Sequence, residues 1–363
     1  MPVIVSLLLV AVGVVLLVIG ADALVSGASR IAQRFGIPPL IVGLTIVAIG
    51  TSMPEITVST TAALAGSAEL ALGNVVGSNI FNVLLILGIA ALILPLSVQV
   101  SLIRQEVPVM VGFSLLLFAM LLDGSLTRIE AGILFLLGVG YLLLLVVQSR
   151  RAARAGQDVD VDLPDAAGWL AKVPAPLLIG LGPVGLVGGA QLLVQGASDI
   201  ALSLGVSELV VGLTVVAIGT SLPEVAASVA AVLRGERDMA IGNVVGSNVF
   251  NIALCLGLAG LVAPAGLPAP AQLLAFDLPF MVLVAIALLP LIFTDYEVSR
   301  LEGGVLLSWC AVYLVWTVLG ATGSPMLDTF SRIALFGLAP LTAAFLVATV
   351  VMALRGPNRP SSP

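Results

Sequence analysis

The stretch GLTIVAIGTSMPE, Gly43 to Glu55, decides the fold, and it returns almost unchanged as GLTVVAIGTSLPE, Gly212 to Glu224. Extended to Leu40–Glu55 and Leu209–Glu224, the two copies agree at 13 of 16 positions. Each copy places one glutamate inside an apolar segment, beside a proline, two hydroxyls and several glycines. A bilayer tolerates such a segment only where it lines a protected cavity. We therefore expect the two copies to face each other around a bound cation.

The composition is that of a membrane protein, with 60% apolar and only 9% charged residues. Long apolar stretches follow one another, without the ten-residue alternation of a barrel, so we predict an all-α polytopic membrane protein. The chain has no histidine, and its two cysteines, Cys255 and Cys310, lie in separate apolar segments. Zinc, copper and haem sites and a histidine proton relay are therefore not expected. We expect no enzymatic activity, no resident cofactor and no nucleic-acid partner; the lipid bilayer surrounds the protein.

Eleven transmembrane spans are predicted. They run over Val3–Val25, Leu40–Leu64, Leu70–Leu94, Val107–Leu122, Ala131–Val147, Pro174–Leu204, Leu209–Leu233, Met239–Val262, Leu273–Phe293, Gly304–Leu319 and Ile333–Leu354. A second motif, GNVVGSNIFN at Gly73–Asn82, recurs as GNVVGSNVFN at Gly242–Asn251, and both motifs return 169 positions later. The repeat unit therefore holds five helices, and an odd number inserts the second copy upside down, as in secondary transporters.

The predicted organisation is a 5+5 inverted repeat with one extra C-terminal helix. Its parts are a first repeat (1–148), a cytoplasmic loop (149–172), a second repeat (173–321), and the eleventh span with its tail (322–363). With the N-terminus outside, twelve of the 14 lysines and arginines fall on the cytoplasmic face; the exceptions are Arg128 and Arg332. This positive-inside bias predicts a multi-pass cell (inner) membrane protein with a cytoplasmic C-terminus.

The first motif interrupts its own helix. Pro54 has no N–H, so the carbonyl of Gly50 loses its helical partner, and Pro223 and Gly219 repeat this in the second half. Carbonyls near the break, including those of Ala48 and Ala217, become candidate ligands. Thr51, Ser52 and Glu55 span about one turn, so their oxygens can converge with these carbonyls. An acid at this depth costs roughly 2.5–3.5 kcal/mol on insertion scales and therefore needs a function.

The second motif adds hydroxyl and amide oxygens. Ser78 and Asn82 are four residues apart and share a face, as do Ser247 and Asn251. The other asparagines, which either bind the ion or only join helices, are Asn74, Asn79, Asn243 and Asn248. Such an oxygen-only set favours a hard cation, and roughly six to eight oxygens suit Ca2+. Two carboxylates supply enough negative charge to neutralise one Ca2+ or two Na+.

The paired GTSMPE/GTSLPE and GNVVGSN segments resemble the α-repeats of the Ca2+/cation antiporter superfamily, and within it the prokaryotic Na+/Ca2+ exchangers. The resemblance covers the first ten spans. It implies exchange of Na+ for Ca2+ by alternating access, with one central Ca2+ site formed by both glutamates, flanking Na+ sites, mutually exclusive binding, and a sliding pair made of spans one and six. It also implies the ion ligands, which are Glu55, Thr51, Ser52, the Ala48 carbonyl, Ser78 and Asn82 in the first half, and Glu224, Thr220, Ser221, the Ala217 carbonyl, Ser247 and Asn251 in the second.

One position departs from the family pattern. Several relatives carry aspartate where this chain has Asn251, so the predicted site holds only two acids. This argues against a K+-dependent exchanger, since such relatives use aspartates in the second repeat. Proton-coupled relatives typically carry extra carboxylates in the third and eighth spans, which this sequence lacks. Two alternatives remain open at this point, a Ca2+/H+ antiporter on the same fold and a passive cation channel.

Overall fold

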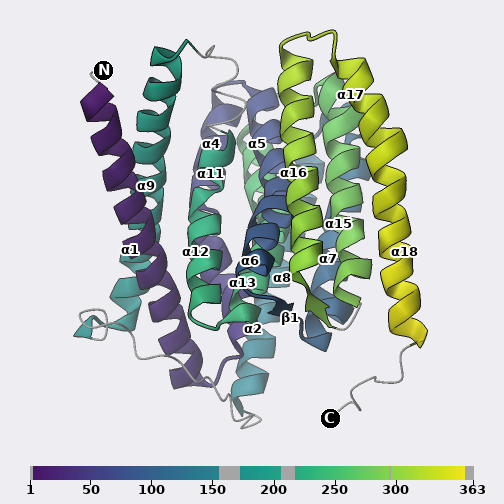
Figure 1. The fold of residues 1–363 in the computed structure, drawn as a ribbon. Helices are drawn as coiled ribbons and strands as arrows, with labels where there is room; N and C mark the ends of the chain where they lie inside the picture. The colour runs from purple at the N-terminus through teal and green to yellow at the C-terminus, as the bar shows by residue number, and fades with distance from the viewer. Residues whose placement is uncertain (1–2, 155–171, 206–216, 294–295, 356–363) are drawn as a thin grey trace.

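The computed structural model describes residues 3–154, 172–205, 217–293 and 296–355. It is a bundle of long helices, with α1 and α9 along one side and α18 along the opposite side (Figure 1). Among the described residues, nine helices are long and apolar enough to cross a membrane, or ten if the bent pair Pro39–Thr51 and Met53–Leu64 is one span. The prediction of a polytopic helical membrane protein is therefore confirmed. The predicted span Leu209–Leu233 is described only from Ala217 onward.

The first half contains eight α-helices, four π- or 3-10-helical turns and two short strands. In order they are α1 (Val3–Phe35), α2 (Pro39–Val42), η1 (Gly43–Val47), α3 (Ala48–Thr51), α4 (Met53–Leu64), α5 (Ala68–Phe81), η2 (Asn82–Ile86), α6 (Leu87–Ile93), β1 (Leu96–Ser97), η3 (Leu102–Glu106), α7 (Val107–Met120), η4 (Leu121–Asp123), β2 (Ser125–Leu126) and α8 (Arg128–Arg154).

The described part of the second half follows the same order, and one further hydrophobic segment comes after it. The elements are α9 (Ala175–Ser203), α11 (Ala217–Thr220), α12 (Leu222–Leu233), α13 (Arg237–Phe250), η7 (Asn251–Leu256), α14 (Gly257–Val262), β3 (Leu267–Pro268), η8 (Leu273–Asp277), α15 (Leu278–Phe293), β4 (Glu297–Val298), α16 (Arg300–Ala321), α17 (Leu327–Ile333), η9 (Ala334–Leu338) and α18 (Ala339–Arg355). Most of the predicted loop 149–172 lies outside the described residues.

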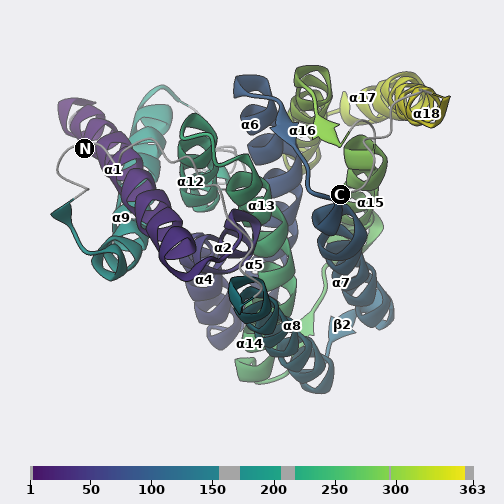
Figure 2. The ribbon, with the colours of Figure 1, turned by 90° about the horizontal axis from the view of Figure 1, so that it is seen from below.

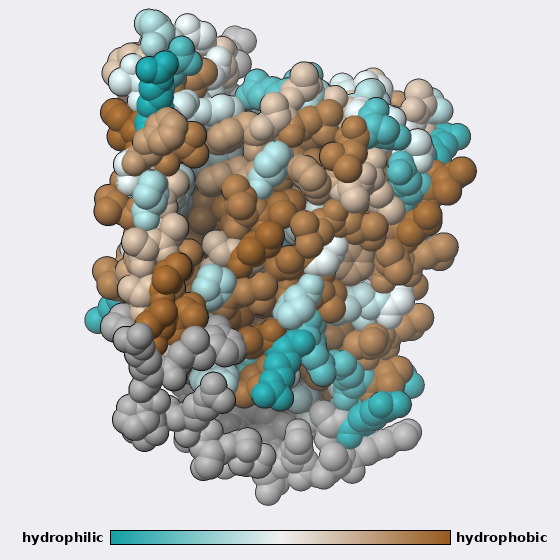
Figure 3. Space-filling model, turned by 90° about the vertical axis from the view of Figure 1, so that its right-hand side faces the viewer, coloured by the Kyte–Doolittle hydropathy of each residue, from teal (hydrophilic) through white to brown (hydrophobic). Residues whose placement is uncertain are grey.

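The outer surface is largely apolar, as lipid contact requires. Hydrophobic side chains cover much of the middle of the face shown in Figure 3, and hydrophilic groups gather mainly toward its upper and lower edges. The segments that carry the second motif are the most deeply buried of the candidate spans, with 83% of the window in Arg237–Val262 and 72% of that in Ala68–Ile93 buried. Figure 2 accordingly shows α5 and α13 in the middle of the bundle.

Several spans contain a π-helical turn, which the sequence analysis did not predict. Three of these turns, η3, η8 and η9, come directly before helices whose second residue is a proline, Pro108, Pro279 and Pro340. A proline ring clashes with the carbonyl four residues earlier, and a widened turn accommodates the ring without ending the span. Two other π-helical turns, η2 and η7, begin at Asn82 and Asn251, which places irregular backbone beside the second motif in both halves.

Two small antiparallel sheets connect the halves. Strand β1, between α6 and α7, pairs with β4, and Leu96 lies opposite Val298. Strand β2, before α8, pairs with β3, and Leu126 lies opposite Leu267. Each sheet therefore takes one strand from each half of the chain.

Helices α1 and α9 pack along their length through glycines spaced seven residues apart. A Cβ added to Gly13 would lie 2.7 Å from the carbonyl oxygen of Gly189, and one added to Gly20 would lie 2.7 Å from the backbone nitrogen of Leu186. A Cβ on Gly27 would lie 2.9 Å from Leu178. Residue numbers rise along α1 as they fall along α9, so the two helices are antiparallel. The full set of spaced glycines is Gly13, Gly20 and Gly27 in α1 and Gly182, Gly189 and Gly196 in α9.

Polar residues near the end of α1 also pack inside the protein, which explains why α1 extends to Phe35 and not only to the predicted Val25. Ser26 and Ser29 are buried, and Arg30 donates through Nη1 to the Val173 carbonyl at 2.8 Å. Earlier on the same helix, Asp22 forms an ion pair with Arg234 at the end of α12. The Nε atom of Arg234 donates to Asp22 Oδ1 at 2.8 Å. Glu236, in the turn that follows, is only 6% exposed.

Replacing Gly189 with alanine should destabilise the protein by about 1–3 kcal/mol, because the added methyl group would press on the backbone of α1. The matched control is Gly188→Ala on the same helix, where a new Cβ has no described heavy atom within 4 Å. That control should be neutral or slightly stabilising, since alanine favours helix more than glycine. Thermal unfolding of the purified proteins in detergent measures both effects. Equal melting temperatures for the two variants would contradict the tight α1–α9 contact.

Glu236 should make stability depend on pH. Burial and the nearby negative charge of Asp238 raise the pKa of Glu236 to about 7, and Ser29 and Arg234 lower it in part. The folded state therefore binds this proton more tightly than the unfolded state, so stability should rise as the pH falls from about 7 to about 4.5. Glu236→Gln should lack this component, which melting curves at stepped pH would detect. The exposed Glu69→Gln is the control, and parallel pH profiles for wild type and Glu236→Gln would refute the assignment.

Candidate cation site

The site begins at the break in the first motif. The helical segments Pro39–Thr51 and Met53–Leu64 meet at an angle of 46°, and Ser52 between them leaves helical geometry with φ −79° and ψ 5°. Pro54 occupies the first turn of α4, where its missing N–H has no helical partner to lose. The second half repeats this, since Ser221 has φ −87° and ψ 3° and Pro223 lies in the first turn of α12.

The break places a carboxylate in the first turn of each new helix. Glu55 lies in the first turn of α4 and Glu224 in that of α12, and they are 0% and 1% exposed. Backbone N–H groups at a helix start favour negative charge there. The two carboxylates are also close enough to interact electrostatically. Two buried anions repel each other, so a bound cation would stabilise the pair.

Serines connect the carboxylates to neighbouring helices. Ser78 on α5 donates its hydroxyl to Glu55 Oε1 at 3.3 Å. Ser52, from the first motif, donates to Glu224 Oε1 at 3.4 Å and so bridges the two halves of the chain. Cys255 in η7 adds a contact that the sequence analysis did not anticipate, because its thiol lies 3.1 Å from the backbone carbonyl oxygen of Glu55. The two motif copies therefore meet at the carboxylates.

Several buried oxygen atoms around the carboxylates have no hydrogen-bond partner among the described residues. They are Glu55 Oε2, Glu224 Oε2, Asn82 Oδ1, Asn251 Oδ1, Ser221 Oγ and Ser247 Oγ. Buried polar atoms are nearly always satisfied, so a group of oxygens without protein partners is suited to a bound cation or to water. Carboxylate, amide and hydroxyl oxygens are the ligands that hard cations such as Ca2+ and Na+ prefer.

The amides that flank the site pair across the two halves. Asn82 donates through Nδ2 to Asn248 Oδ1 at 3.0 Å, and Asn251 donates through Nδ2 to Asn79 Oδ1 at 3.1 Å. These bonds occupy the amide nitrogens of Asn82 and Asn251 and leave their oxygens as the unpaired ends. Asn79 and Asn248 therefore hold the neighbouring amides in place, a supporting role that spacing alone had left open.

The remaining predicted residues lie in more local contacts. The Ala48 carbonyl accepts hydrogen bonds from the Ser52 N–H at 3.0 Å and the Thr51 hydroxyl at 3.3 Å. Thr51 also lies 3.1 Å from Asn243 Oδ1. Thr220 is half-buried and lines a lateral cavity, and Ala217 opens α11. The start of the second copy of the first motif, residues 212–216, lies outside the described part of the chain.

Two further acids in the membrane region are held by tyrosines. The Tyr141 hydroxyl donates to Glu106 Oε2 at 2.5 Å, and the Tyr313 hydroxyl donates to Asp277 Oδ1 at 3.0 Å. Within the described part of the chain, no hydrogen bond joins either acid to Glu55 or Glu224. Among the described residues, no group of three or more histidine, cysteine, aspartate or glutamate side chains gathers into a metal cluster. Any bound cation would therefore rely on two carboxylates and neutral oxygens.

Comparisons with known proteins show which proteins this chain is similar to. The sodium/calcium exchanger protein family matches residues 5–147 and 174–319. The inner membrane protein YrbG of Escherichia coli (strain K12) is 38% identical over 311 residues, covering 83% of this chain and 92% of YrbG. The sodium/calcium exchanger MaX1 of Methanosarcina acetivorans is 33% identical over 346 residues, covering 86% and 98%. A solved structure of the sodium-calcium exchanger NCX_Mj matches with a TM-score of 0.73 and 31% identity, covering 86% of this chain and 98% of that one.

Calcium should stabilise the folded protein through this site. A ligand present at 100 times its dissociation constant adds about 2.7 kcal/mol of stability. We expect added Ca2+ to raise the melting temperature of the wild type, and Glu55→Gln or Glu224→Gln to lose that shift. Glu106→Gln is the matched control, because Glu106 is also a buried glutamate but is bonded to Tyr141. The same calcium shift in all four proteins would place the ion elsewhere.

Proposed function

The chain belongs to the sodium/calcium exchanger protein family, and from this premise we propose that it is a secondary active antiporter that exchanges Na+ for Ca2+. The observation that carries the proposal is the pair of buried carboxylates, Glu55 and Glu224, each with an unpaired oxygen and one from each half of the chain. Two carboxylates balance one Ca2+ or two Na+, so the same charges would hold either cargo but not both. This competition couples the two fluxes.

The proposed ligands are oxygens from both halves. They are the side chains of Glu55, Thr51, Ser52, Ser78 and Asn82 with the Ala48 carbonyl, and those of Glu224, Thr220, Ser221, Ser247 and Asn251 with the Ala217 carbonyl. The unpaired oxygens of Asn82, Asn251, Ser221 and Ser247 support their inclusion. The Ala48 carbonyl would become a ligand only if it gave up the hydrogen bond that it now accepts and bound the ion instead. Ca2+ and Na+ are the transported substrates, and no resident cofactor is proposed.

An inverted-repeat arrangement accounts for contacts that occur twice. The pairs Asn82–Asn248 and Asn79–Asn251 become the same contact when each residue is replaced by its counterpart 169 positions away. The two strand pairs are related in the same way. Strands β1 and β3 occupy equivalent places in the two halves, as do β2 and β4, so the β1–β4 pair is equivalent to the β2–β3 pair. The first helices of the two halves, α1 and α9, run antiparallel at their glycine contacts. These observations favour two five-helix units, 1–148 and 173–321, related by an axis in the membrane plane.

Alternating access would arise from movement of α1 and α9 across the remaining helices. Their shared glycine contacts support movement as one body, since close backbone packing resists separation. The ion pair between Asp22 and Arg234 links α1 to α12, which carries Glu224. The proposed orientation places the N-terminus outside and the C-terminus in the cytoplasm of a cell membrane, because this places twelve of the 14 basic residues inside.

Calcium flux in proteoliposomes tests the proposal. Radiocalcium uptake should follow an imposed Na+ gradient, and Glu55→Gln or Glu224→Gln should reduce uptake to that of empty vesicles. Glu106→Gln should retain transport, as the buried-glutamate control. Uptake that ignores Na+ but follows a pH gradient would identify a Ca2+/H+ antiporter instead. Uptake without any counter-ion, at rates far above those of a carrier, would identify a channel.

A further inference from the structure

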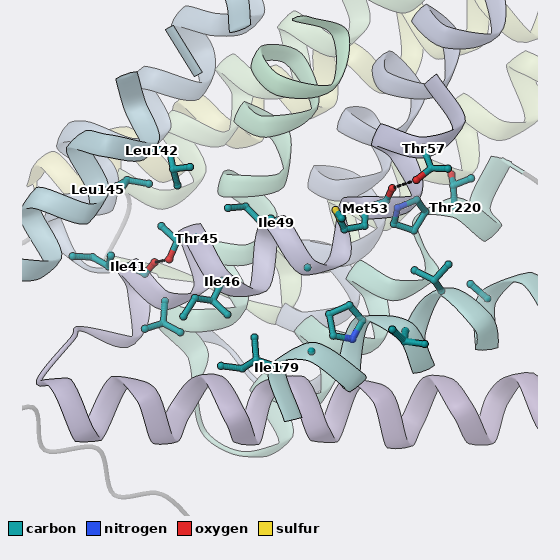
Figure 4. Close-up of a pocket in the computed structure, with 18 of the residues that line it drawn as sticks. Ile41, Thr45, Ile46, Ile49, Met53, Thr57, Leu142, Leu145, Ile179 and Thr220 are labelled. Carbon is teal, nitrogen blue, oxygen red and sulfur yellow. Dashed lines mark hydrogen bonds between the residues drawn. The ribbon is translucent and has the colours of Figure 1, made fainter. Parts of the chain in front are cut away.

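A large apolar cavity lies beside the cation site, and of the proposed ion ligands only Thr220 is among its described lining residues. Its volume is about 1470 Å3, which exceeds the roughly 300–1,000 Å3 of pockets for drug-sized ligands. Its walls come from the bent first-motif span, from α8 and from α9. Figure 4 shows Ile41, Ile46 and Ile49 on the bent span, Leu142 and Leu145 on α8, and Ile179 on α9.

The cavity faces the hydrocarbon region of the bilayer. Three lining residues, Phe35, Met53 and Val184, are 56%, 49% and 67% exposed, and all are apolar. A surface of this kind within a membrane span is wetted by lipid chains and not by water. A long apolar occupant would therefore enter from the side, between α9 and the bent span.

Charge is confined to one end of the cavity. Arg150, near the end of α8, is the one charged side chain among the described lining residues, and no carboxylate lines the wall. The buried hydroxyl-bearing residue Ser149 lies next to it in the lining. Phe35 lies in the same lining, with the guanidinium of Arg34 5.9 Å from its ring centroid. An occupant that matches these features has an apolar tail and an anionic head.

We propose that this cavity is a binding site for an anionic phospholipid, with an acyl chain between α9 and the bent span and the phosphate beside Arg150. Basic pockets between transmembrane helices bind anionic headgroups, and each CH2 group of an acyl chain that is buried adds to the affinity. The inner end of the cavity reaches Gly50, Pro54 and Gly219, the residues of the two helix breaks. The bound chain would therefore lie directly behind the cation site.

The chain offers matched variants for both ends of this lipid. Arg150→Gln removes the proposed headgroup contact, and Arg151→Gln is its control, because Arg151 is the exposed neighbour outside the lining. Gly188→Leu places a side chain into the cavity, at a glycine whose added Cβ has no described heavy atom within 4 Å. Gly140→Leu is its control, on the exposed side of α8 and equally free of neighbours, but outside the lining.

Native mass spectrometry tests the proposal on full-length protein purified from bilayers of phosphatidylglycerol and phosphatidylcholine. We expect the wild type, Arg151→Gln and Gly140→Leu to retain one phosphatidylglycerol. Arg150→Gln should bind it about fivefold more weakly, the effect of one basic residue at an anionic surface. Gly188→Leu should retain none. Equal retention of both lipids by the wild type, retention only of detergent, or full retention by Gly188→Leu would overturn the proposal, and none of these readouts requires transport.

Discussion

The structure depends on the electrostatics of two carboxylates that are buried together within a membrane. Glu55 and Glu224 are fully removed from solvent, and each keeps one oxygen without a partner among the described residues. Low dielectric surroundings make an uncompensated pair of negative charges unfavourable, so a bound cation would stabilise the pair in its ionised form. The surrounding features serve this pair: broken helices bring N–H groups toward the acids, and serines and amides from neighbouring helices surround them.

The asparagine contacts fix the orientation of two amide groups beside the carboxylates. An asparagine presents both a donor and an acceptor, and only its oxygen suits a cation. In both halves the amide nitrogen is occupied by a partner asparagine of the other half, at 3.0 and 3.1 Å. The direction of each free amide oxygen is therefore fixed by contacts within the protein. The same bonds join α5 to the α13–η7 region, so ligand orientation and helix packing have a common origin.

Much of this could be predicted from the sequence. Hydropathy correctly predicted a polytopic helical membrane protein, of which nine or ten candidate spans lie within the described residues. The recurrence of GTSMPE and GNVVGSN predicted that Glu55 and Glu224 face each other. Spacing could not reveal the π-helical turns, because they depend on how proline rings are accommodated within packed spans. The predicted first span also ended at Val25, since Ser26, Ser29 and Arg30 resemble a loop until it is known that both serines are buried and that Arg30 donates to the Val173 carbonyl. The seven-residue glycine spacing of α1 and α9 was present in the sequence and was overlooked.

The two small sheets have a consequence for biogenesis. Each needs one strand from the first half and one from the second, so β1 and β2 have no partners until residues 267–298 have been synthesised. Asn79 and Asn82 must also wait for Asn251 and Asn248. The first half, α1 to α8, therefore enters the membrane with backbone and amide groups whose partners have not yet been made. The nascent chain reaches its final fold only after most of it has left the ribosome.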